Sequence, residues 1–95
     1  MTVEELKTEL EKAIKELTSS GFGSIDAITV ENLEKSSLAA SELELKEGRH
    51  LIENLLNAIK AIQEGKSKAE SGTLRLTALE FYLKKLSGSE NTEDL

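Results

Sequence analysis

The sequence predicts an all-α fold, a small antiparallel helical bundle of four helical segments. Apolar residues recur at spacings of three and four along most of the chain, which contains no proline and hardly any alternating β-branched stretch. With 38% hydrophobic and 32% charged residues, the composition is that of a folded domain. We expect residues 1–87 to form a single helical-bundle domain and residues 88–95 to form a flexible acidic C-terminal tail.

The first helix is expected over residues 2–19. Its apolar stripe consists of Val3, Leu6, Leu10, Ala13 and Leu17. Thr2 and Glu5 have the spacing of a capping box, in which each side chain accepts a hydrogen bond from the backbone of the other residue. The glycine- and serine-rich stretch 19–24 ends this helix, and we expect Phe22 within it to tuck over the end of the bundle.

A second helix is expected to begin with Thr29 as its cap and to run to Leu45. Its centre, SSLAAS, is rich in small side chains that let another backbone approach closely. This feature favours either tight packing within the bundle or a self-association face. The candidate self-association patch consists of Ser36, Ala39, Ala40 and Leu43.

The third segment, residues 50–63, is the most apolar part of the chain, and Gly48 is the expected break before it. An alternative is three helices with one long central helix that continues through Gly48. Apolar residues recur every seven positions through this region, at Leu38, Leu45, Ile52 and Ile59. A glycine inside a helix costs only about 1 kcal/mol relative to alanine. Because such a helix would be about 54 Å long, the alternative predicts a dimer.

The fourth helix is expected to start with a capping box at Ser67 and Glu70 and to end near Lys84 and Lys85. Apolar residues on the third and fourth segments exceed a narrow stripe. The extra apolar surface is expected to be covered either by a second protein chain or by a wider core within one chain.

Charge is distributed unevenly along the chain, which carries a formal net charge of −6. Acidic residues dominate 20–48 and basic residues dominate 49–87, so we expect the two segments to face one another within the fold. The net charge disfavours nucleic acid and anionic membranes as partners. Carboxylates along 26–47 leave open a second interpretation, an acidic inhibitor that mimics nucleic acid.

Residues suited to catalysis or to metal binding are scarce. The chain has no cysteine and one histidine, and it contains no glycine-rich phosphate loop. We therefore expect no enzyme activity, no cofactor, no metal and no small-molecule substrate. The N-terminal residues are acidic where a secretory signal would be basic, and no apolar run of about 18 residues occurs. A cytoplasmic location is expected.

His50 is the candidate phosphoacceptor. In size and helix content the chain is similar to histidine phosphotransfer domains, which carry an exposed histidine on one helix. The resemblance implies a phosphoryl group on His50 with Arg49 as a nearby cation. Ile52 fits the family pattern, but Glu53 and Asn54 stand where the family has lysine and glycine. The other interpretation of His50 is a partly exposed residue in the first turn of a helix.

Taken together, the residues predict a non-enzymatic protein–protein interaction or structural module: an adaptor, a subunit or a self-associating helical bundle. Its expected partner is another protein or a second copy in a homodimer. The alternatives are the histidine phosphotransfer domain and the acidic inhibitor.

Overall fold

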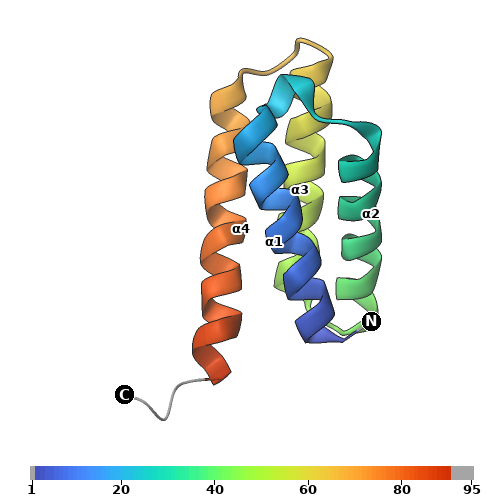
Figure 1. The fold of residues 1–95 in the computed structure, drawn as a ribbon, viewed down its shortest axis with the longest axis vertical. Coiled ribbons are helices and arrows are strands. Elements are labelled where there is room, and N and C mark those ends of the chain that lie inside the picture. Colours follow the sequence, from blue (N-terminus) through green and yellow to red (C-terminus); the bar gives the residue numbers. More distant parts are fainter. Residues whose placement is uncertain (1, 91–95) are drawn as a thin grey trace.

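The computed structural model describes residues 2–90, with side chains for residues 2–86, and this part of the chain forms four antiparallel α-helices without a strand (Figure 1). They are α1 (Val3–Ser20), α2 (Ala27–Glu42), α3 (Lys46–Gln63) and α4 (Ala69–Glu90), and a short 3₁₀ helix, η1 (Phe22–Ser24), follows α1. The predicted all-α bundle of four helical segments is confirmed, and the alternative with one long central helix is wrong.

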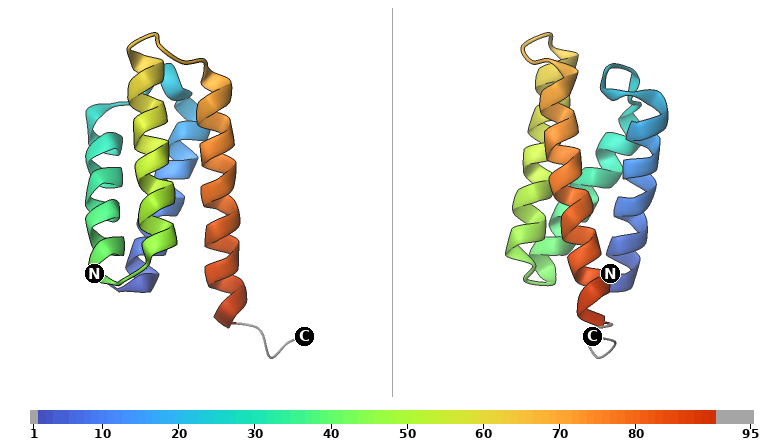
Figure 2. Two further views of the ribbon diagram at one scale, coloured as in Figure 1. Left: turned by 180° about the vertical axis from the view of Figure 1, so that it is seen from behind. Right: turned by 90° about the vertical axis from the view of Figure 1, so that its left-hand side faces the viewer.

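Helix α3 lies between α2 and α4, as the left view in Figure 2 shows, and packs along both of them. Helix α1 packs mainly on α2 and makes only sparse contacts with α4. One apolar core joins all four helices. Its fully buried large members are Leu6, Leu10, Leu17, Leu33, Ile52, Leu55, Ile59 and Leu79.

The beginnings of the first two helices are fixed by local hydrogen bonds. In α1 the capping box is confirmed: Glu5 N–H donates to Thr2 Oγ1 at 3.1 Å, and Thr2 N–H donates to Glu5 Oε1 at 2.9 Å. In α2 the prediction of Thr29 as the cap is wrong. The cap is Asp26, whose Oδ1 accepts from both the N–H (3.0 Å) and the hydroxyl (2.9 Å) of Thr29.

The break between α2 and α3 occurs at residues 43–45 and not at Gly48. Glu44 adopts a left-handed conformation with φ of 62°. Leu45 N–H then donates to the Ala40 carbonyl at 2.8 Å, and Glu44 N–H to the Ser41 carbonyl at 3.1 Å. This hydrogen-bond pair is a Schellman motif, which usually places glycine where Glu44 stands.

Gly48 instead lies inside α3, where it gives room to an aromatic ring. A Cβ atom added to Gly48 would lie 2.8 Å from the Tyr82 hydroxyl oxygen and 2.9 Å from Cε2 of its ring. Gly72 of α4 has the same role for Phe22, because a Cβ there would lie 2.7 Å from Cε1 of that ring. Phe22 is buried against the end of the bundle, as predicted.

Helix α4 differs from its prediction at both ends. It begins at Ala69, so Ser67 does not occupy the cap position, and its hydroxyl donates to Ser71 Oγ at 3.2 Å. The predicted Ser67 and Glu70 capping box is therefore wrong. The helix continues through Glu90, so residues 88–90 of the proposed tail are helical, whereas 91–95 lie outside the described residues.

Candidate interaction surface

The patch of small residues on α2 faces the inside of the bundle. Ser36, Ala39 and Ala40 are buried, and Leu43 is half-buried against the core. A second copy would reach these side chains only if α2 left the bundle. Their position fits the close-packing interpretation of the small residues.

His50 lies near the start of α3 and is exposed. The neighbouring cation, Arg49, donates from Nε to Glu53 Oε2 at 3.3 Å. The carboxylate that departs from the phosphotransfer pattern thus binds the arginine that the resemblance would use. The phosphoacceptor role of His50 stays a prediction from the sequence.

Acidic and basic segments face one another within the fold, as predicted. Glu34 of α2 lies 4.0 Å from Lys60 of α3, and Glu47 of α3 lies 4.0 Å from Lys85 of α4. All four side chains are mostly solvent-exposed, and exposed pairs of this kind contribute little to stability.

Within residues 2–86, no three histidine or carboxylate side chains gather as a metal site would require. None of the helices in the described part of the chain has the length and apolar character needed to cross a bilayer.

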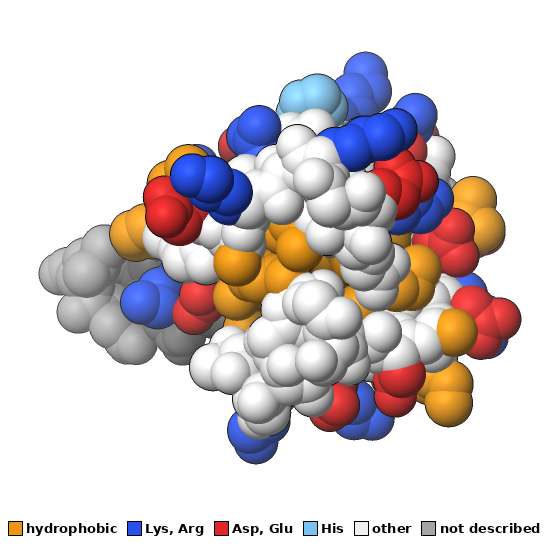
Figure 3. All heavy atoms as spheres, turned by 90° about the horizontal axis from the view of Figure 1, so that it is seen from above, with side chains coloured by type: hydrophobic (Ala, Val, Ile, Leu, Met, Phe, Trp, Pro, Cys, Tyr) orange, Lys and Arg blue, Asp and Glu red, His pale blue; other side chains and the backbone are white. Residues whose placement is uncertain are grey.

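The outward side of α4 carries two large apolar side chains that are mostly exposed to solvent. Leu74 is 71% exposed and Phe81 is 63% exposed. They are seven residues apart, so on an α-helix they lie within about 20° of the same direction. Thr77 lies between them, and Glu70 and Lys84 flank them along the helix. We call these five residues the α4 outer face. The view from above shows apolar side chains at the margin on the α4 side (Figure 3).

Helix α2 also has two exposed apolar residues, Ile28 and Leu38. They are ten residues apart, which separates their directions by about 80° on a helix. They do not form one stripe, and isolated exposed apolar residues are common on protein surfaces. The α4 outer face is therefore the stronger candidate for a contact surface.

Lys84 covers part of the exposed ring on the α4 outer face. Its Nζ atom lies 5.8 Å from the centroid of Phe81, the distance of a cation–π contact. Together with Thr77 and Glu80, these two residues line a shallow hollow of about 90 Å³. An exposed aromatic ring beside a cation and a small hollow suits the docking of another side chain.

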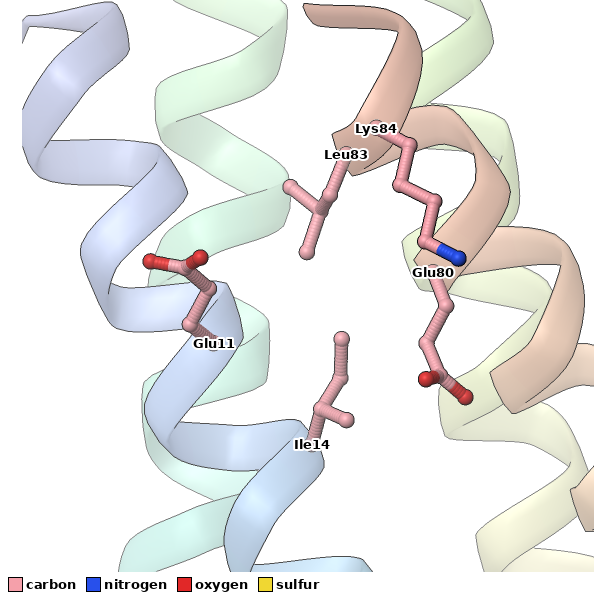
Figure 4. Close-up of a pocket in the computed structure, with 5 residues that line it drawn as sticks. All are labelled: Glu11, Ile14, Glu80, Leu83 and Lys84. Carbon is pink, nitrogen blue, oxygen red and sulfur yellow. The ribbon is translucent and has the colours of Figure 1, made fainter. Parts of the chain in front are cut away.

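A second hollow of about 300 Å³ lies where α1 and α4 make few contacts. Figure 4 shows Ile14 of α1 and Leu83 of α4 pointing into this space, while the charged ends of Glu11, Glu80 and Lys84 turn away from it. Glu80 and Lys84 line both hollows. The α4 outer face thus continues around the helix into an apolar groove with charged edges.

The sequence contained a signal for the α4 outer face that the prediction did not use. Leu76, Leu79, Leu83 and Leu86 follow the three- and four-residue spacing of one buried stripe. Leu74 and Phe81 lie on the opposite side of the same helix. The sequence shows only that the apolar residues of this segment exceed a narrow stripe, and the packing shows that α4 has neighbours on one side.

Comparison with protein families, characterised proteins and solved structures found no match for this chain. The chemistry of its own surface is therefore the basis for a proposal about function.

Proposed function

We propose that this protein is a non-enzymatic interaction module that binds protein through the α4 outer face. One observation carries the proposal: the surplus apolar surface on α4 is left uncovered by the chain itself. On α3, Leu56 and Ala58, which widen its apolar stripe, are buried within the bundle. On α4, Leu74 and Phe81 stay in solvent.

The kind of partner follows from the chemistry of this face. Full burial of a leucine or phenylalanine side chain contributes about 1.5–3 kcal/mol, so covering Leu74 and Phe81 would supply part of the free energy of a contact with another protein. Aromatic residues are enriched at the centres of protein interfaces. The net charge of −6 argues against nucleic acid as the partner. The lack of cysteine is in keeping with a cytoplasmic site of action, which forms part of the proposal.

Photo-cross-linking in cells tests this proposal. A photoreactive phenylalanine analogue at position 81 is compared with the same analogue at position 57, where Asn57 is exposed on α3. We expect covalent adducts with protein at position 81 and few at position 57. Equal yields at the two positions would show that the α4 outer face is not a binding surface.

A further inference from the structure

The order of residue types along the α4 outer face is symmetrical about its centre, except that its two ends carry opposite charges. Along the helix it presents an acid (Glu70), an apolar residue (Leu74), a small residue (Thr77), a second apolar residue (Phe81) and a base (Lys84). We propose that the partner bound by the α4 outer face is a second copy of this chain. This inference rests on the proposed function. The two α4 helices pack antiparallel, with Leu74 of each copy on Phe81 of the other and Glu70 of each copy opposite Lys84 of the other.

The spacing of these residues fits a twofold axis that passes between Thr77 and Ala78. At 1.5 Å per residue, Leu74 and Phe81 each lie about 5 Å along the helix from that axis. Glu70 lies about 11 Å from it on one side and Lys84 about 10 Å on the other. Each residue therefore meets its complement across the axis, as a twofold-symmetric interface requires.

The charges favour the antiparallel arrangement over the parallel one. Both Glu70 and Lys84 are exposed, and neither has an ion-pair partner among the side chains described for residues 2–86. An antiparallel pair brings each carboxylate near an ammonium group at both ends of the contact. A parallel pair would place like charges together, and it would also align the two helix dipoles.

The size of the contact sets the expected strength. One helix pair covers less than the roughly 800 Å² per partner of a standard stable interface. We therefore expect a weak, reversible dimer whose population rises with protein concentration. The small side chains of Thr77 and Ala78 at the axis let the helices approach closely enough for Phe81 to reach Leu74 of the partner.

Charge-reversal variants test this arrangement by sedimentation equilibrium in about 0.15 M salt, where long-range repulsion between the acidic chains is screened. Glu70→Lys alone and Lys84→Glu alone each place like charges at both ends of the dimer. We expect each to weaken dimerisation about tenfold. An equal mixture of the two variants restores opposite charges at both ends, so we expect heterodimers that form as readily as the wild-type dimer.

A matched control is Glu31→Lys, which makes the same charge change at an exposed position on α2 and should leave dimerisation intact. Phe81→Glu should abolish the dimer, while helix content by circular dichroism confirms folding for every variant. Three results would overturn the inference. They are a wild-type chain that stays monomeric at all concentrations, a dimer that survives Phe81→Glu, and a mixture of Glu70→Lys with Lys84→Glu that dimerises no more tightly than either variant alone. If the purified chain is monomeric but position 81 cross-links to a different protein in cells, the proposed function stands and the self-pairing is rejected.

Discussion

Replacing Gly48 by alanine should destabilise the bundle, although alanine is the better helix former. In a solvent-exposed helix the change would contribute about 1 kcal/mol of stability. Here the new methyl carbon would lie 2.8–3.0 Å from the hydroxyl and ring atoms of Tyr82, which is 7% exposed. Favourable carbon contacts occur at about 3.5–4.0 Å, so the ring or the α3–α4 contact must shift.

The magnitude follows from the two opposing effects. Overpacking of a well-packed core costs about 1–3 kcal/mol, which exceeds the gain in helix propensity. We expect Gly48→Ala to lower the free energy of unfolding by about 1 kcal/mol and the melting temperature by roughly 4–8 °C. Urea denaturation followed by far-ultraviolet circular dichroism measures the first quantity, and a thermal melt measures the second.

Two further variants separate the contact from a general effect on α3. Asn57→Ala, at an exposed position on the same helix, should be neutral or slightly stabilising. In a Tyr82→Leu background the ring is gone, and Gly48→Ala should then become stabilising. A Gly48→Ala variant that is more stable than wild type while Tyr82 is present would show that the Tyr82 ring does not require glycine at this position.

Three other predictions follow from the caps and from the single tyrosine. Glu44→Gly should raise the free energy of unfolding by about 1 kcal/mol in urea denaturation, because glycine adopts the left-handed conformation without strain; an unchanged value would argue against that conformation. Hydrogen bonds from Thr29 lower the pKa of the Asp26 carboxyl in the folded chain. The contribution of the ionised carboxylate to the free energy of unfolding is therefore present above the unfolded pKa and is lost as pH falls below about 4. Thermal melts across this range should show that Asp26→Ala is less stable than wild type near neutral pH and that the difference shrinks in acid. Burial and the nearby Glu47 raise the pKa of the Tyr82 hydroxyl, so the stability linked to its neutral form is lost as pH rises above about 10. Tyrosinate absorbance should give a higher titration midpoint for the folded chain than for the chain in urea, and equal midpoints would contradict burial of Tyr82.

The sequence predicted some of the features that depend on residues close together along the chain, although the expected cap at Thr29 and the expected capping box at Ser67 and Glu70 did not form. The capping box of Thr2 and Glu5 needs only residues three apart, and it formed as expected. The role of Gly48, by contrast, depends on a contact between distant parts of the chain. Gly48 is required by the ring of Tyr82, and nothing near Gly48 in the sequence reveals that contact. Glu44 was missed because its side chain is unusual at a left-handed position.

The candidate site was hard to predict for a related reason. A pattern of apolar residues shows that a helix has something to bury, but it does not show how many neighbours the helix has. Helix α3 has neighbours on two sides, which explains its broad apolar surface. Helix α4 packs closely on α3 and only sparsely on α1, so Leu74 and Phe81 remain outside the core.

Antiparallel pairing of α4 is tested most directly by a disulfide at its twofold axis. The chain has no cysteine, so Thr77→Cys introduces a single thiol beside that axis, and Asn57→Cys introduces one on the exposed side of α3. Under mild oxidation we predict that Thr77→Cys rapidly forms a disulfide-linked dimer, whereas Asn57→Cys does so slowly. Equal rates for the two variants would contradict the pairing of two copies through α4.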